Sequence, residues 1–330
     1  MRRREFMTLI GGLAIAWSLA CYAQEPKQPL KRVGVLASQV PCPLQPDNPL
    51  VRRLAELGWV EGQNLVFECV SAVGQYGHLD QLAALARELV SRRPDVLTAG
   101  PVPFVRALKH QTSTIPIVMF ATGLMPDLVS NLARPEGNVT GVSLFTGVIL
   151  PKRVEILKEM VPQLRRLAVI TAAADPKVIE AIEASFRFTA GKLGFTWQRF
   201  QPIVANDYDE IFAHLTEEHF DAAYIVADPL SGLNVARIGQ LGLRHRIPTV
   251  GQFPAYAKDG FFLLAYGQDY LWTILRAMDF VDKILRGAKP GELPVERATK
   301  LQLVINLKTA NALGLTVPPS LITRADEVIE

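Results

Sequence analysis

A group of small, hydroxyl-bearing, aromatic and acidic residues follows apolar runs along the chain and could bind a small molecule. Hydroxyl groups and the free amides at helix N-termini bind anionic groups such as carboxylates. An aspartate binds an ammonium group, and aromatic rings cover an apolar body. We therefore predict a ligand-binding site made of Ser38, Thr98, Gly100, Phe120, Thr122 and Gly123 in the first half of the chain and of Thr171, Asp228, Pro229, Gln252, Phe253 and Tyr266 in the second.

Some of these residues also have ordinary structural explanations. Asp228 precedes Pro229 and could cap the helix that starts there. Tyr266 could belong to the core with its hydroxyl satisfied, and Phe120 could be buried between layers. Thr98 and Thr122 favour the binding interpretation, because polar residues in glycine-rich loops at strand ends have little reason to be there for packing.

Catalytic and metal-binding motifs are not found in the sequence. It has no Gly-x-Ser-x-Gly elbow, no phosphate loop ending in Gly-Lys-Ser or Gly-Lys-Thr, and no Gly-x-Gly-x-x-Gly after the first predicted strand. No two histidines have the spacing of a helical zinc site, and there is no Cys-x-x-Cys. We therefore expect a binding protein rather than an enzyme, with no cofactor and no metal.

The N-terminus has the three-part pattern of a secretory signal. Arg2, Arg3 and Arg4 precede a mostly apolar, uncharged run over residues 7–20, and small residues follow. The start is similar to a twin-arginine export motif. We predict a signal peptide over 1–23, cleaved after Ala23, and a periplasmic protein; an uncleaved N-terminal anchor, or a lipoprotein modified at Cys21, are the alternatives.

The charge argues against a nucleic-acid partner. The formal net charge is +3, and residues 1–23, with three arginines and one glutamate, contribute +2 of it. The mature chain is therefore close to +1 and lacks the concentrated positive charge that nucleic-acid binding requires.

Two cysteines remain after cleavage at Ala23, and export would place them where disulfides form. Cys42 follows the first predicted strand and Cys69 lies at the end of the second. Neighbouring parallel strands are close enough for a disulfide, so we predict a Cys42–Cys69 bond. The alternative is two free thiols, with Cys69 packed as a small apolar residue.

The elements that must position these residues alternate along the chain. Apolar runs predict strands at 31–37, 64–70, 95–99, 115–120 and 139–144, then at 166–171, 195–200, 222–227, 248–250, 261–266 and 301–306. Helical periodicity is clearest over 78–93, 176–193 and 269–286. This alternation predicts an α/β fold with two doubly wound parallel-sheet lobes. Residues 145–147 are the candidate hinge, and the predicted site residues lie at the carboxyl ends of the strands, where such sheets bind ligands.

Several longer motifs resemble one protein family. They are residues 1–12, 56–64, 134–142, 151–153, 303–310 and 312–320, and together they span nearly the whole chain. These motifs are similar to those of ABC-transporter substrate-binding proteins of the tryptophan/tyrosine type.

The resemblance implies a type I periplasmic-binding-protein fold, with the ligand between the lobes and the membrane permease of an ABC importer as partner. It also implies that the chain crosses between lobes several times. We expect the first lobe to comprise 24–145 plus about 262–290, and the second 146–261 plus about 291–330. The segment after Gly123 and the proline-rich segment 39–49 depart from the family pattern, so the ligand need not be an aromatic amino acid.

The preferred function is therefore that of a monomeric solute receptor that delivers a small organic molecule to an ABC importer. A ligand-sensing subunit for a membrane receptor would use the same closing lobes. A two-lobed glycosyltransferase has a similar architecture, but export argues against it, because nucleotide sugars are cytoplasmic.

Overall fold

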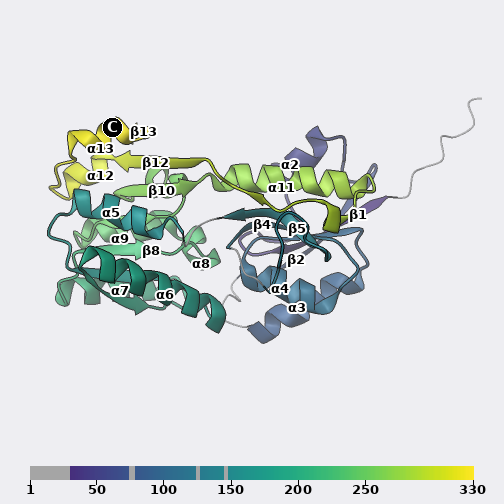
Figure 1. The fold of residues 1–330 in the computed structure, drawn as a ribbon, viewed down its shortest axis with the longest axis horizontal. Helices are drawn as coiled ribbons and strands as arrows, with labels where there is room; N and C mark the ends of the chain where they lie inside the picture. The colour runs from purple at the N-terminus through teal and green to yellow at the C-terminus, as the bar shows by residue number, and fades with distance from the viewer. Residues whose placement is uncertain (1–29, 74–78, 124–126, 145–147) are drawn as a thin grey trace, which may run out of the picture.

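A computed structural model describes residues 30–73, 79–123, 127–144 and 148–330, with backbone alone for Leu79, Ala121 and Thr122. The predicted signal peptide (1–23) and the candidate hinge (145–147) lie outside these residues. The chain forms two lobes side by side along the long axis of the molecule (Figure 1). Each lobe is built on one sheet with helices packed against it, so the predicted α/β fold with two lobes is confirmed.

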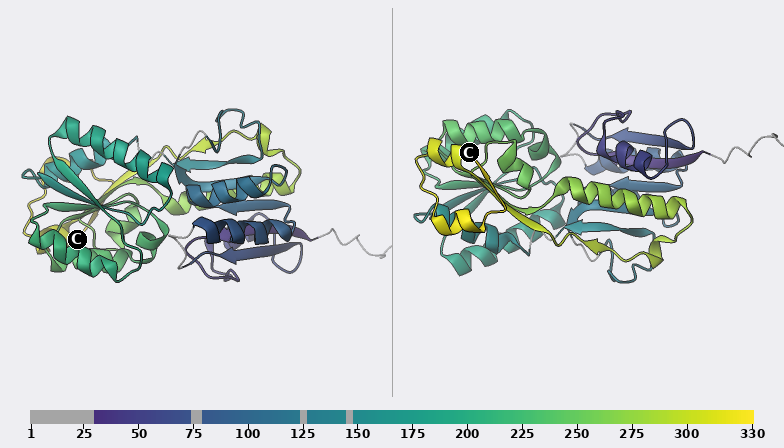
Figure 2. Two further views of the ribbon diagram at one scale, coloured as in Figure 1. Left: turned by 90° about the horizontal axis from the view of Figure 1, so that it is seen from below. Right: turned by 90° about the horizontal axis from the view of Figure 1, so that it is seen from above.

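The first lobe contains a six-stranded sheet in which every neighbouring pair is parallel. Its strands, in spatial order, are β11 (Glu296–Arg297), β5 (Val139–Leu144), β4 (Ile117–Gly123), β3 (Val96–Ala99), β1 (Lys31–Ala37) and β2 (Leu65–Ser71). On one face α3 (Leu79–Ser91) packs against α4 (Val102–Gln111). On the other, α2 (Pro49–Glu56) packs against α11 (Tyr270–Leu285) (Figure 2).

The second lobe contains a seven-stranded sheet. Its strands, in spatial order, are β13 (Glu327–Ile329), β12 (Leu301–Asn306), β10 (Leu264–Gln268), β9 (Thr249–Gly251), β8 (Ala222–Ile225), β6 (Arg166–Ile170) and β7 (Thr196–Phe200). Its helices are α5 (Leu150–Met160), α6 (Pro176–Leu193), α7 (Asp207–Glu217), α8 (Pro229–Leu233), α9 (Val235–Arg244), α10 (Pro254–Lys258), α12 (Leu307–Ala312) and α13 (Pro319–Arg324).

Both faces of the second sheet are buried. In β6, Leu167 and Val169 belong to the cluster formed with α5 and α6, whereas Ala168 and Ile170 belong to the cluster formed with α7 and α9. This alternation explains why the strand is apolar throughout. Among the described helices, none is long and apolar enough to cross a membrane.

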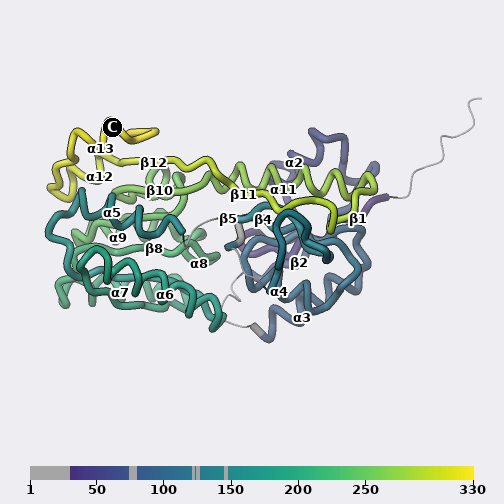
Figure 3. Tube along the Cα trace, viewed as in Figure 1, coloured from purple at the N-terminus to yellow at the C-terminus, as the bar shows by residue number. Residues whose placement is uncertain are grey.

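One pair in the second sheet is antiparallel, which differs from the all-parallel prediction. β10 and β12 pair in opposite directions, with Leu264 opposite Ile305. β10 runs toward the first lobe, where the chain continues as α11, and β12 brings the chain back (Figure 3). Two strands that carry the chain out of a lobe and back into it must run in opposite directions.

The crossing points lie later in the chain than the expected boundaries. β10 still belongs to the second sheet, although we expected residues from about 262 in the first lobe. β11 pairs with β5 of the first sheet, although we expected the first lobe to end near 290. The chain therefore leaves the second lobe after Gln268 and re-enters it at Leu301. The family analogy gave the order of the crossings but not their positions.

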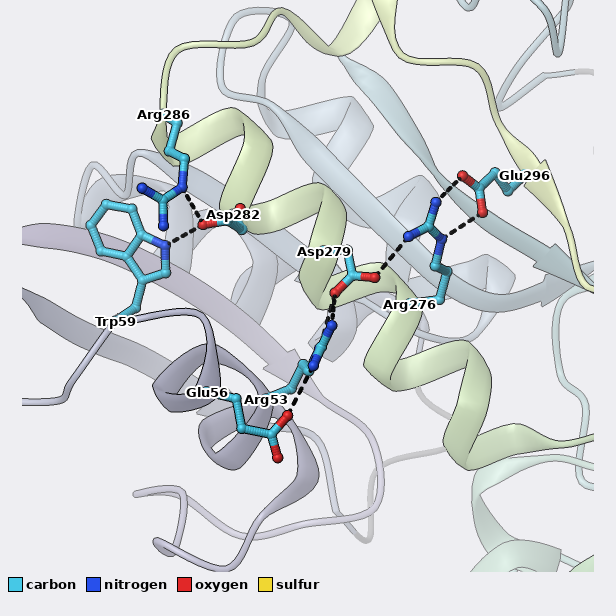
Figure 4. Close-up of polar contacts among 8 residues, drawn as sticks. All are labelled: Arg53, Glu56, Trp59, Arg276, Asp279, Asp282, Arg286 and Glu296. Carbon is cyan, nitrogen blue, oxygen red and sulfur yellow. Dashed lines mark hydrogen bonds and ion pairs between the residues drawn. The ribbon is translucent and has the colours of Figure 1, made fainter.

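Polar contacts hold α11 on the first lobe (Figure 4). Arg53 of α2 donates to Asp279 at 2.8 Å, and Trp59 donates to Asp282 at 2.8 Å. Arg276 donates to both carboxylate oxygens of Glu296, at 2.6 and 2.7 Å. The helix that returns from the second lobe is thus fixed to α2, to Trp59 just after α2, and to β11.

Cys42 and Cys69 form a disulfide, with their Cα atoms 5.6 Å apart. Cys69 lies on β2, in register with Val35 of β1, and Cys42 lies in the loop that follows β1. The bond ties the proline-rich loop to the sheet at the edge that faces the second lobe.

Candidate functional site

A cavity of about 630 Å³ is lined by residues of both lobes, at the carboxyl ends of strands from both sheets. This volume is typical of small-molecule sites, and so is the position. Residues that line it from the first lobe include Ser38, Gln39, Pro101, Val102, Gly123, Leu144 and Tyr270. Those from the second include Thr171, Asp175, Phe186, Tyr224, Asp228, Pro229, Gln252 and Phe253.

Several predicted site residues come together at this cavity. They are Ser38, Gly123, Thr171, Asp228, Pro229, Gln252 and Phe253. All follow or end strands, and the carboxyl ends of parallel strands meet at one edge of a sheet, which accounts for their lying next to one another.

Four other predicted residues, Thr98, Gly100, Phe120 and Tyr266, are not among those that line it. Thr98 is fully buried and donates to the carbonyl oxygen of Val118 at 3.0 Å, so its hydroxyl is used within the sheet. Phe120 is 8% exposed and its ring covers Gly100, where an added Cβ would lie 2.9 Å from that ring. Tyr266 packs against the core of the second lobe. The side chain of Thr122 lies outside the described atoms.

Asp228 is the N-cap of α8. Its Oδ1 accepts from the amide of Ser231 at 2.8 Å, and its Oδ2 accepts from the amide of Ala172 at 2.7 Å and the hydroxyl of Thr171 at 3.3 Å. Burial raises the pKa of Asp228 above its ordinary value, against these hydrogen bonds. The capping explanation therefore accounts for the carboxylate, which the sequence alone had left open between a cap and an ammonium ligand.

A buried arginine behind the cavity was not predicted as a site residue. Arg153 of α5 is 0% exposed; its Nη1 donates to the hydroxyl of Tyr224 at 2.9 Å and its Nε donates to the carbonyl of Tyr266. Gln252 Nε2 lies 3.2 Å from the same hydroxyl. The helix pattern indicated that Arg153 is buried, because it shares the apolar face of α5 with Leu150.

Aromatic rings form much of the remaining wall. Phe186 meets Tyr224 edge to face, with ring centroids 5.0 Å apart. Phe253 of the second lobe lies 5.1 Å from Tyr270, the first residue of α11, so two rings meet across the lobes. Such a wall suits an apolar or aromatic body.

Three further contacts join the lobes beside the cavity. Arg106 of α4 binds the carboxylate of Asp175, which caps α6. Asp127 of the first lobe lies 3.9 Å from Lys177 Nζ of the second. Gln39 lies against Gly232 of α8. A Cβ added at Gly232 would be 2.1 Å from the side-chain amide nitrogen of Gln39.

Metal ligands are not grouped in the part of the chain that the structure describes: it contains no cluster of three or more His, Cys, Asp or Glu side chains that could hold an ion.

Comparison with known proteins shows relatives over most of the chain. A "Tyrosine-binding protein" from Clostridioides difficile (strain R20291) is 22% identical over 267 residues, covering 80% of this chain and 75% of that protein. A conserved domain protein from Vibrio cholerae has a crystal structure with a TM-score of 0.76, 27% identity and coverage of 92% of this chain and 100% of its own. A Streptococcus pneumoniae ABC domain in complex with L-Trp has the same TM-score at 24% identity, covering 91% of this chain and 100% of its own.

Residues 48–329 match the family described as "ABC transporter substrate binding protein". This match takes in every element from α2 to β13, which is both sheets except β1, and the twin-lobed fold and the cavity between the lobes agree with it. The chain therefore belongs to the ABC transporter substrate binding protein family, whose members are solute-binding proteins and not enzymes.

Proposed function

We propose that the chain is an exported receptor that captures one small organic solute between its lobes and delivers it to the permease of an ABC importer. It acts as a monomer in the periplasm after cleavage of residues 1–23. The observation that carries the proposal is the cavity of about 630 Å³, which is lined from both lobes and is large enough to enclose a molecule of amino-acid size.

The lining supports a ligand with an apolar or aromatic body. Phe186, Phe253 and Tyr270 supply rings, and Ser38, Gln252 and Thr171 supply polar groups at strand ends. The related proteins named for tyrosine and solved with L-Trp make aromatic amino acids and their analogues the first compounds to test.

Closure follows if the ligand binds the closed arrangement more tightly than the open one, since a ligand shifts a conformational equilibrium only through that difference. A solute held by walls from two lobes meets this condition, because opening removes its contacts with one of them. We therefore propose a rigid-body closure about the interlobe connections.

Native mass spectrometry of the protein purified from its host tests the proposal. We expect one small molecule bound to each mature chain, and X-ray scattering should show compaction when the ligand is returned to the stripped protein. Deleting the gene should abolish uptake of the recovered molecule. Unchanged uptake combined with altered gene expression would instead identify a sensing subunit, and an empty protein that no solute compacts would contradict both roles.

A further inference from the structure

Tyr224 and Gln252 line one end of the cavity, and Arg153 lies directly behind them. Arg153 and Tyr224 are 0% exposed and Gln252 is 7% exposed. The Tyr224 hydroxyl lies 2.9 Å from Arg153 Nη1 and 3.2 Å from Gln252 Nε2. These three side chains form one hydrogen-bonded chain that runs from a buried positive charge to the ligand space.

The hydrogen bonds among these three side chains run in one direction. A guanidinium has only donors and stays protonated, so the Tyr224 oxygen must accept from Arg153. The Tyr224 proton then points away from Arg153, either into the cavity or to the carbonyl oxygen of Gln252, since the two ends of an amide are assigned by their partners. In the first arrangement Tyr224 is the donor that faces the ligand. In the second, Gln252 presents its NH₂ group there. Each arrangement therefore presents one donor at this end: the Tyr224 hydroxyl beside the Gln252 Oε1 in the first, and the Gln252 NH₂ group in the second.

The backbone beside Arg153 allows its side chain to reach Tyr224. An added Cβ at Gly267 would lie 1.9 Å from the carbonyl oxygen of Gln252 and 3.1 Å from Arg153 Nη2. Phe186 packs edge-on against the Tyr224 ring and fixes its orientation. Glycine at 267 thus lets β10 approach Gln252 closely enough for Arg153 to reach the tyrosine.

The charge of Arg153 favours an acceptor group at this end of the cavity. None of the described residues that line the cavity is a lysine or arginine, so a ligand carboxylate would find no direct ion-pair partner on the wall. Three aspartates line the cavity: Asp228 is used as a cap, Asp175 is bound by Arg106, and Asp259 is exposed at the end of α10. The positive charge nearest to the Tyr224 end is that of Arg153, one hydroxyl away.

We propose that Arg153 is a positioning residue that orients the Tyr224 proton, so that either Tyr224 or Gln252 presents a hydrogen-bond donor and this end of the cavity binds an acceptor oxygen, a carboxylate foremost, of a ligand whose apolar body lies along Phe186 and Phe253. This inference rests on the proposed function, because it assigns the orientation and chemical class of the solute held in the same cavity.

The test compares two probes that share one ring system. Indole-3-propionate carries a carboxylate and no ammonium, and tryptamine carries an ammonium and no carboxylate. Calorimetric titration of the mature protein should show at least about tenfold tighter binding of indole-3-propionate, the loss expected for one buried hydrogen bond to a charged group. Tryptamine binding as tightly as indole-3-propionate would overturn the proposal.

Two variants then test the donor chain. Tyr224→Phe removes one oxygen and should reduce the indole-3-propionate preference at least several-fold. Gln252→Glu supplies an acceptor for the Tyr224 proton and a negative charge, so it should reverse the preference. A ratio of affinities is a suitable readout, because a general loss of stability does not change which probe is preferred. If the ratio of the two affinities stays at the wild-type value in both variants, the role proposed for these hydrogen bonds is overturned.

Tyr208→Phe is the matched control. Tyr208 is a fully buried tyrosine of the same lobe that does not line the cavity, and among the described residues its hydroxyl has no hydrogen-bond partner. Its removal should leave the ratio of affinities unchanged, and a changed ratio would count against the proposal.

Two outcomes separate this inference from the proposed function. A host-purified protein that retains a solute but binds neither probe would overturn the ligand class assigned here and leave the receptor function standing. A protein that carries no host solute and transports none, yet prefers indole-3-propionate, would contradict the receptor function and support the donor end.

Discussion

Arg106 of α4 donates a hydrogen bond to the carboxylate of Asp175, the residue that caps α6 in the opposite lobe. Both side chains are largely buried, at 13% and 8% exposed, and Arg106 also binds Asp127 of its own lobe at 2.8 Å. Since Asp175 lines the cavity, this contact joins the lobes beside the ligand space. The Arg106–Asp175 pair therefore stabilises the closed arrangement in addition to the ligand.

Replacing Arg106 by alanine should favour the open arrangement. The change leaves Asp175 Oδ2 and Asp127 without their arginine donor, and a hydrogen bond to a charged group is worth about 1.5–3 kcal/mol. We expect ligand affinity to fall roughly tenfold or more, mainly through faster dissociation. Ligand-free Arg106→Ala should also have a larger radius of gyration than the parent protein in X-ray scattering.

Arg237→Ala is the control for this change, because Arg237 pairs with Asp209 within the second lobe and both side chains are about two-fifths exposed. It should leave affinity and radius unchanged. If Arg106→Ala behaves in the same way, the interlobe pair has no part in closure.

The Cys42–Cys69 bond should contribute substantially to stability. The two cysteines are 27 residues apart, and the chain-entropy relation gives about 3–4 kcal/mol for a loop of that size. The double variant Cys42→Ala with Cys69→Ala should lower the free energy of unfolding by roughly that amount. Unfolded, unreduced mature protein should show no reactive thiol in a thiol titration; two thiols per chain would contradict the bond.

Glu296 should make stability fall at acid pH. The side-chain hydrogen bond from Arg276 lowers the pKa of Glu296 below its ordinary value of 4.5. A carboxyl group with a lowered folded-state pKa stabilises the fold above its unfolded value and loses that contribution as pH falls through the folded one. The loss should therefore appear below about pH 4.5, and it should be at most about 1 kcal/mol, since both side chains are about a third exposed.

Denaturant unfolding of Glu296→Gln at several pH values measures this contribution. The variant should be less stable than the parent protein at neutral pH, and the difference should shrink as pH falls below about 4.5. Glu88→Gln, on the exposed face of α3, is the control and should change stability little. A difference for Glu296→Gln that does not vary with pH would show that the carboxylate charge is unimportant.

Asp228→Ala should lower the stability of the ligand-free protein. Loss of an N-cap costs about 0.5–2 kcal/mol, and the amide of Ala172 loses its acceptor as well. Asp228→Asn should retain most of the stability, because asparagine caps helices about as well as aspartate. Thermal unfolding without ligand decides the matter: an alanine variant that melts like the parent protein but binds poorly would show that the carboxylate serves the ligand.

Most strands were predictable because their apolar runs are continuous, and both β1 and β12 occur at the predicted bounds. The short edge strands β11 and β13 were not predicted. The direction of the strands alone predicted which edge of each sheet holds the cavity. Which side chains at that edge face the cavity did not follow, because Thr98 and Phe120 turn inward depending on the pleat and on what packs beside them. Arg153 was missed because a charged residue on an apolar helix face is found only when burial is considered together with periodicity.

Gly267→Ala should destabilise the protein and disturb the site together. An added Cβ would lie 1.9 Å from the backbone carbonyl oxygen of Gln252, so β10 or the strand-end segment at Gln252 must shift. Overpacking of this kind costs about 1–3 kcal/mol. Gly191→Ala in α6 is the control, since a Cβ there has no atom within 4 Å and alanine favours a helix by about 0.5–1 kcal/mol over glycine. Thermal unfolding should thus give opposite signs for the two changes. If Gly267→Ala melts at or above the temperature of the parent protein and keeps its affinity, the close approach of β10 to Gln252 is not needed to hold Arg153 in place.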